Sequence, residues 1–132
     1  MSHKRWFVSC TVAAVLFASA NTAYTHHSLA AEFDVDKMIE ISGTITTMAW
    51  TNPHGWLHVD VKDADGNVEN WAVEFASPNS LYRRGWSKAD LPTGASVTIV
   101  GYAPRDNSNT ISATEVTLSD GRRLFAGTRQ EE

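Results

Sequence analysis

The side chains best suited to chemistry are concentrated in one stretch of this chain of 132 residues, residues 48–61, which reads MAWTNPHGWLHVDV. Its two tryptophans offer flat apolar area for stacking, and its two histidines offer ring nitrogens that bond or ligate near neutral pH. Together with Glu74, these residues indicate a binding site for a small molecule, a glycan or a protein. The candidate ligand-binding residues are Trp50, Asn52, His54, Trp56, His58 and Glu74.

Histidines near the start of the chain predict metal binding as the alternative function. His26 and His27, with His54 and a nearby carboxylate, supply donors suited to copper or nickel, with zinc the less favoured ion. If processing exposes Tyr24 as the first residue, its amine, two peptide nitrogens and the His26 imidazole can surround Cu²⁺ or Ni²⁺ in a square plane. No HExxH or CxxC spacing supports the site, so merely solvated histidines are the competing interpretation.

The sequence disfavours an enzyme. It has no GxSxG motif and no Walker-type loop, and its single cysteine, Cys10, lies in a segment that we expect to be removed. Glu74 with His54 or His58 offers acid–base groups, but many proteins contain such a pair. No catalytic residue is therefore predicted. His54 also has a purely structural interpretation, in which its ring bonds a backbone carbonyl and stabilises a turn.

Residues 1–23 have the composition of a secretory signal peptide. Lys4 and Arg5 precede an apolar run over residues 6–18, and small residues follow up to Ala23. The run is shorter than the ~20 residues that a membrane-spanning helix needs, which disfavours a permanent anchor. We therefore predict a periplasmic or extracellular protein with no stable membrane span after cleavage.

Cleavage would also change the charge and the thiol content of the chain. The full sequence has a net charge of −4, and loss of Lys4 and Arg5 makes the charge −6. This argues against nucleic acid as a partner, because phosphate binding needs a basic surface. Loss of Cys10 leaves no internal disulfide and no thiol nucleophile. The remaining ~109 residues allow one modest core.

The candidate residues must be positioned by strands and turns. In residues 56–62 every second side chain is apolar, beginning with Leu57. Alternation with a period of two indicates a half-buried strand, with Trp56 and His58 on its outward face. Residues 51–55, TNPHG, have turn chemistry and place His54 in a loop before that strand.

A long first strand is predicted over residues 38–50. Its inward side chains are expected to be Ile39, Ile41, Ile45, Thr47 and Ala49. Gly43 indicates a bulge or a bend, so that one strand can serve two sides of a small barrel. Asp65-Gly66 predicts a hairpin turn into a strand over residues 68–75, where Trp71 belongs to the core face.

The second half of the chain predicts a helix followed by strands. Ser77 is expected to cap a short helix that ends at Gly85. Two strands follow over residues 95–102 and 110–118, and a slip in alternation predicts a bulge within residues 113–116. A short segment over residues 123–125 comes after the next turn.

This order of elements predicts a mainly β fold, a small OB-like antiparallel barrel of five to six strands with one short helix between the third and fourth strands. The expected segments are a signal peptide (1–23), an N-terminal arm (24–37), the barrel (38–127) and a frayed tail (128–132). By analogy, the outward face of the second and third strands is the ligand surface. It would hold Trp56, His58, Asp60, Asn70 and Glu74, with His54 and Trp50 at its rim.

Several distinctive short motifs occur along the chain after the predicted signal peptide. They are His26-His27-Ser28, Ala31-Glu32-Phe33-Asp34, Trp50-Thr51-Asn52-Pro53-His54, Ser77-Pro78-Asn79, Arg83-Arg84-Gly85-Trp86, Asp120-Gly121-Arg122 and Leu124-Phe125-Ala126-Gly127. Together they resemble the DUF6152 family of small exported bacterial proteins of uncharacterised function, over essentially the whole mature chain. The resemblance implies a bacterial protein located outside the cytoplasm, and it supplies no activity and no catalytic residue.

Overall fold

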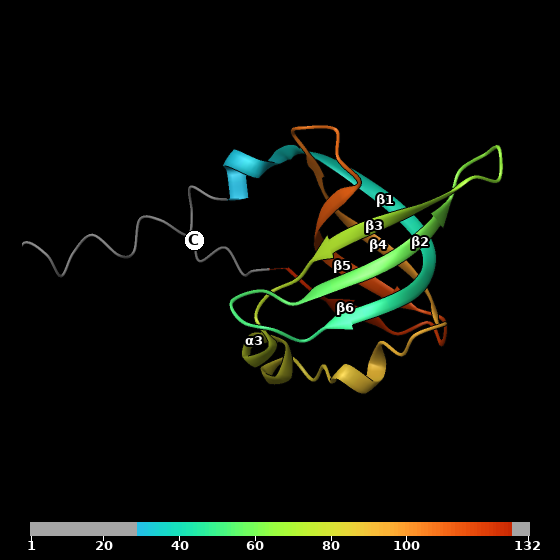
Figure 1. The fold of residues 1–132 in the computed structure, drawn as a ribbon. Helices are drawn as coiled ribbons and strands as arrows, with labels where there is room; N and C mark the ends of the chain where they lie inside the picture. Colours follow the sequence, from blue (N-terminus) through green and yellow to red (C-terminus); the bar gives the residue numbers. More distant parts are fainter. Residues whose placement is uncertain (1–28, 128–132) are drawn as a thin grey trace, which may run out of the picture. The chain divides into compact units, whose positions relative to one another are not determined.

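The computed structural model describes residues 29–127, so the predicted signal peptide, His26, His27 and the predicted tail lie outside the described residues. Contacts divide the chain into one unit that ends at Ala31 and a second unit that begins at Glu32. The second unit contains the following strands and helices, most of which are labelled in Figure 1. They are β1 (Phe33–Ala49), β2 (Trp56–Lys62), β3 (Val68–Glu74), α3 (Pro78–Arg83), the 3₁₀ helix η1 (Lys88–Asp90), β4 (Ser96–Pro104), β5 (Thr110–Leu118) and β6 (Arg123–Phe125).

The strands of residues 29–127 form one sheet in the order β3-β2-β1-β4-β5-β6, and β3 also pairs with β5. Five strands therefore close into a ring, and β6 extends the sheet beyond β5 (Figure 1). The mainly β, OB-like barrel with a short helix between β3 and β4 is confirmed. The closing pair of β3 and β5 is parallel, which departs from the antiparallel pairing expected throughout.

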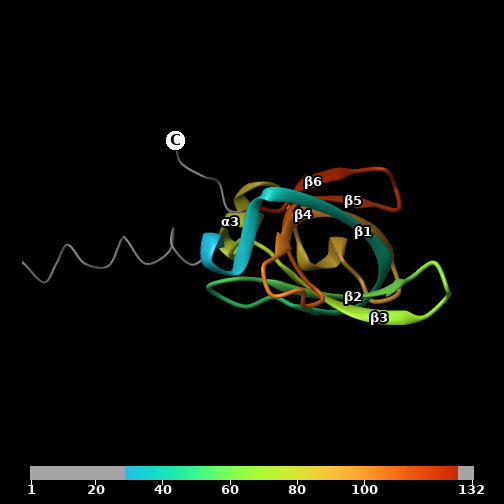
Figure 2. The ribbon, with the colours of Figure 1, turned by 90° about the horizontal axis from the view of Figure 1, so that it is seen from above.

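The long strand β1 bends so that it pairs with two neighbours. Its residues 33–44 pair with β4, and its residues 44–49 pair with β2 (Figure 2). At Gly43 an added Cβ would lie 2.3 Å from the carbonyl oxygen of Asp60, so only glycine allows the two backbones this close. The prediction that one strand serves two sides of the barrel is therefore confirmed.

β1 begins earlier than predicted, at Phe33 instead of residue 38. Phe33 is buried and pairs with Pro104, but the register shifts between Asp34 and Met38. The irregular pairing breaks the alternation of side chains, and so the sequence carries no periodic signal for this part of the strand.

A bulge near the end of β1 reverses the predicted orientation of its last side chains. The register shifts between Ile45 and Thr47, which makes Thr46 the extra residue. One extra residue moves every following side chain to the opposite face. Met48 is therefore buried and Thr47 exposed, while Ala49 is half-buried. The prediction that Thr47 and Ala49 face the core is wrong for this reason.

The bulge predicted within residues 113–116 is confirmed in β5. Gly101 pairs with Ala113 while the residue before Gly101 pairs with Glu115, which leaves Thr114 as the extra residue. The Thr114 hydroxyl donates to the Val100 carbonyl at 3.1 Å. This bond gives the Val100 carbonyl a hydrogen-bond donor at the point where the bulge interrupts the pairing of β4 with β5.

The helix α3 begins and ends at the predicted signals. The Ser77 hydroxyl accepts a hydrogen bond from the Ser80 N–H at 3.3 Å, and Gly85 follows with a φ of 87°. The next residue, Trp86, is 2 % exposed, and its indole N–H donates to the Phe125 carbonyl at 3.0 Å. Because Trp86 lies in a connection and not in a periodic segment, its burial was not predicted.

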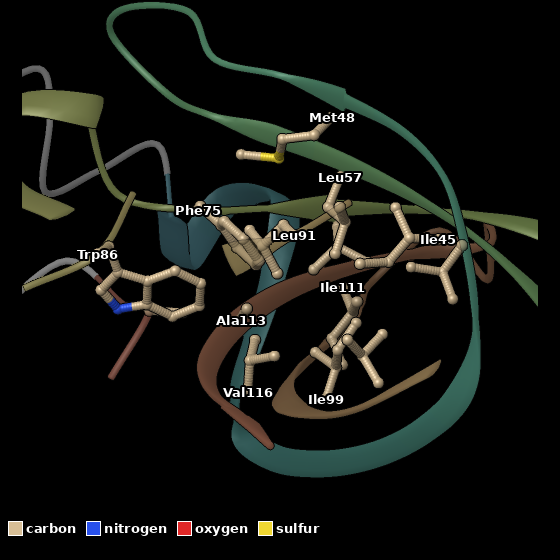
Figure 3. Close-up of a cluster of buried hydrophobic side chains, with 14 of the residues drawn as sticks. Ile45, Met48, Leu57, Phe75, Trp86, Leu91, Ile99, Ile111, Ala113 and Val116 are labelled. Carbon is tan, nitrogen blue, oxygen red and sulfur yellow. The ribbon is translucent and has the colours of Figure 1, made fainter. Parts of the chain in front are cut away.

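The barrel interior is an apolar cluster to which β1 to β5 all contribute side chains (Figure 3). Its labelled members are Ile45, Met48, Leu57, Phe75, Trp86, Leu91, Ile99, Ile111, Ala113 and Val116. Trp71 was expected to belong fully to this core, but it is only half-buried and packs against the cluster. The reason is that β3 pairs with β5 only over residues 72–74, so the residues before them extend past the closed ring.

Candidate functional site

The pairing of β2 with β3 places the candidate residues in rows on the side of the sheet away from the core. The rows are Trp56 opposite Glu74, His58 opposite Ala72, and Asp60 opposite Asn70. Residues directly opposite on antiparallel strands project from the same face. The alternate residues Leu57 and Val59 are buried, which fixes the direction of the core. These six outward residues are called the β2–β3 outer face below, and they are Ala72 and the five residues that the sequence predicts on the outward side of these strands.

The loop before β2 is tied to the end of β3 by its backbone. The Phe75 N–H donates to the Gly55 carbonyl at 2.8 Å, and the Gly55 N–H donates to the Ala76 carbonyl at 3.3 Å. The peptide bond between Asn52 and Pro53 is cis. Asn52 itself is exposed, and its side chain makes no hydrogen bond within the described residues.

His54 is held at the edge of the β2–β3 outer face by two acceptors. Its Nδ1 lies 3.1 Å from the Glu74 Oε1 and 3.1 Å from the Phe75 carbonyl oxygen. A carbonyl oxygen can only accept, so Nδ1 carries a proton, and Nε2 is the ring nitrogen that makes neither of these contacts. The bond to a backbone carbonyl that the structural interpretation of His54 expects is therefore present, and it coexists with the contact to Glu74.

Glu74 is the more enclosed member of this pair, since its side chain is 14 % exposed and that of His54 is 39 % exposed. Burial raises the pKa of Glu74 above its ordinary value of 4.5, and the nearby carboxyl group of Glu32 raises it further, whereas His54 lowers it. Carboxyl groups with a raised pKa beside a histidine are frequent in functional sites, and they also occur in structural pairs.

His58 belongs to a separate hydrogen-bond network on the same face. The amide nitrogen of Asn70 donates to the Asp60 Oδ1 at 2.8 Å, and the Asn70 Oδ1 lies 3.3 Å from the His58 Nδ1. Because a carboxylate oxygen accepts, the Asn70 NH₂ group must face Asp60, and its oxygen must face His58. The protonated nitrogen of His58 is therefore Nδ1. Thr46, the bulge residue, donates to the His58 carbonyl at 3.2 Å, and no local signal in the sequence predicts this support.

Trp50 packs mainly as a structural residue. Its ring meets Tyr82 of α3 edge-on, with ring centroids 5.4 Å apart and planes at 75°. It also packs against the core cluster. Its indole N–H is buried and has no hydrogen-bond partner within residues 29–127. These contacts connect Trp50 to the helix and the core, while Trp56 belongs to the β2–β3 outer face.

A hollow of about 350 Å³ lies elsewhere, over β1, β4 and β5. Its lining is Ser42, Gly43, Thr44, Ser96, Val97, Thr98, Thr117, Leu118 and Ser119. None of the candidate ligand-binding residues lines it. Its side chains are uncharged, and the hydroxyl groups of Ser42 and Thr98 bond each other at 2.8 Å.

Within residues 29–127 no group of three or more histidine, cysteine, aspartate or glutamate residues is placed to hold a metal ion. His26 and His27 lie outside these residues, so the terminal copper or nickel site stays a prediction. His54 has a feature common among metal-ligating histidines, because its Nδ1–H donates to a carbonyl and lies 3.1 Å from a carboxyl oxygen, while Nε2 is on the other side of the ring.

The described residues include no helix with the length and apolar character of a membrane span.

Comparison with known proteins gives a match to one family model. No curated protein matches the chain. A family model matches residues 13–113, which is most of the sequence, and its description is a family of unknown function. The chain therefore belongs to the DUF6152 family.

Proposed function

We propose that this protein is an exported binding protein that recognises its ligand on the β2–β3 outer face. The observation that carries the proposal is the contact of His54 with Glu74 at 3.1 Å, directly beside Trp56. A loop and two strands contribute these three side chains. A stacking ring next to oriented polar groups is the usual composition of a small ligand site.

The surroundings of Trp56 support this proposal. Its neighbour on β1 is Ala49, and Ala72 lies diagonally across on β3. Both side chains end at Cβ, so neither of these two neighbours is large enough to cover a face of the half-buried indole. A large ring that is flanked by alanines offers contact area to a ligand that its own neighbours do not use.

Recovery of the exported protein with its natural ligand tests the proposal. We expect native mass spectrometry of protein purified from the periplasm to show an added mass on the wild type. Trp56→Ala and Glu74→Gln should lose that mass. Phe125→Ala, which removes an exposed aromatic side chain on β6, should retain it. The proposal fails if the wild type carries no added mass and its tryptophan emission does not respond to concentrated periplasmic extract.

Copper or nickel binding is the second candidate, and the orientation of His54 favours it. We expect Cu²⁺ to bind the terminus of the processed chain through His26, with His27 and His54 as further donors and zinc as the weaker ion. Ligation needs a neutral imidazole, so affinity should fall in acid.

Calorimetric titration with Cu²⁺ separates the possible ligands. It should compare the processed protein with His26→Ala, with His54→Ala and with a form extended by one N-terminal residue. Equal affinity of the extended form and the processed form would exclude the terminal site. Loss of affinity in His54→Ala alone would instead assign the metal to the barrel.

A further inference from the structure

We infer that the β2–β3 outer face selects ligands that donate hydrogen bonds, namely organic cations with an amidinium, guanidinium or ammonium group. The inference rests on the proposed function, and it names the chemical class of the ligand. It follows from the positions of the protons in the two hydrogen-bond networks of the site.

The first network leaves acceptors at one end of the face. The His54 Nδ1–H donates to the Phe75 carbonyl and lies 3.1 Å from the Glu74 Oε1, so this proton is not offered to a ligand. The second carboxyl oxygen of Glu74 remains an acceptor. This end of the face therefore presents a carboxyl group beside a histidine whose Nδ1 proton is already used.

The second network, formed by Asp60, Asn70 and His58 further along β2, also leaves hydrogen-bond acceptors on the face. The Asn70 amide is fixed by Asp60, so its oxygen accepts from the His58 Nδ1–H. The second carboxyl oxygen of Asp60 is another acceptor. In both histidines the Nδ1 proton is therefore used within the protein, and the carboxyl oxygens are left to accept from a ligand.

Trp56 lies between these two sets of acceptors, since it pairs with Glu74 and is followed on the same face by His58. Its ring face attracts a cation, and cation–π attraction adds to charge-assisted hydrogen bonds. Its indole N–H is a neutral donor, and Lys62 extends the face at the exposed end of the strand. The carboxylates lie closer to the ring along the ladders, so a cation is favoured over an anion.

Three probes of one shape test this preference by two-dimensional NMR with EDTA present. Benzamidine is a planar cation with N–H donors, benzamide is its neutral counterpart, and benzoate is an anion that only accepts. We expect benzamidine to shift the Trp56 indole signal and to bind about tenfold more tightly than benzamide. Benzoate should give no saturable shift at Trp56.

Variants assign the preference to the site. Glu74→Gln and Trp56→Phe should each weaken benzamidine binding by about fivefold or more. Glu40→Gln removes the same charge from an exposed position of β1 that pairs with β4, and it should bind as the wild type does. The spectra also show directly whether each variant is folded.

The outcomes distinguish the inference from the proposed function. Binding of benzoate at Trp56 as tight as that of benzamidine would overturn the inference and leave the binding face standing. In samples without EDTA, broadening of the His54 and His58 signals by Cu²⁺ without any response to benzamidine would overturn it in favour of a metal site. No response of Trp56 to any probe or ion would overturn both.

Discussion

Glu74 contributes a pH-dependent term to the stability of the fold. Its pKa is raised in the folded protein, chiefly by burial, so the folded chain keeps the proton at a pH where the unfolded chain has released it. The stability from this group is complete below the ordinary value of 4.5 and is lost as the pH rises through the raised pKa. Above the raised pKa, burial of the ionised carboxylate costs stability relative to a neutral side chain.

We expect Glu74→Gln to gain stability relative to the wild type as the pH rises from about 4 to 7, because glutamine does not titrate. Urea unfolding at a series of pH values measures the difference. Glu40→Gln, at an exposed position, is the matched control and should show no such trend. A constant difference at every pH would mean that burial of the Glu74 carboxylate carries no cost.

Trp86 should be the most important tryptophan for stability. It is 2 % exposed, its ring lies 5.6 Å from that of Phe75, and its N–H bonds the Phe125 carbonyl. Trp86→Ala should cost roughly 3–5 kcal/mol in the free energy of unfolding, the range for loss of a large core aromatic. The half-buried Trp71 and Trp56 should each cost less when changed to alanine. Urea melts followed by circular dichroism rank them, and a larger loss at Trp71 would contradict the packing described above.

At the level of elements, the bend of β1 depends on one missing side chain. We expect Gly43→Ala to destabilise the barrel by about 1–3 kcal/mol, because the new Cβ would meet the backbone of Asp60 at 2.3 Å. Ser42→Ala, at the exposed neighbouring position, should stay within about 0.5 kcal/mol of the wild type. Thermal or urea unfolding compares them. Equal stability of the two variants would show that β1 and β2 can move apart at no cost.

Elements with a local signal were predictable from the sequence. The Ser77 cap, the Asp65-Gly66 turn, the β5 bulge and the alternation in β2 all depend on neighbouring residues, and each is found. The bulge at Thr46 and the burial of Trp86 were not predictable, because each is decided by chain segments distant in sequence. The parallel pairing of β3 with β5 is likewise a property of ring closure.

The candidate site likewise has some features that local sequence patterns predict and others that depend on distant segments of the chain. Alternation alone placed Trp56, His58 and Glu74 on the outward face, and the register of β2 and β3 agrees. The contact of His54 with Glu74 needed the loop to fold back on the end of β3, which no spacing in the sequence specifies. Asn52 is exposed, and its role in ligand binding stays a prediction.

For the whole molecule, export is the prediction with the widest consequence. We expect the exported protein to begin between residues 21 and 26, with cleavage after Ala23 as the favoured position, because small residues follow the apolar run. Intact-mass analysis of protein from the periplasm or the medium determines this terminus. A chain that retains Met1 would contradict both the cleavage and the compartment.

The parallel pairing that closes the ring has a consequence for dynamics. Only Ala72, Val73 and Glu74 of β3 pair with β5, and the last of these is the acid of the candidate site. A ladder this short should be among the first to open locally, and its amide protons should then exchange readily with solvent. A ligand that holds Glu74 would stabilise the closed form and slow this exchange. Hydrogen–deuterium exchange over residues 72–74 would therefore report an occupied site even before the chemical identity of the occupant is known.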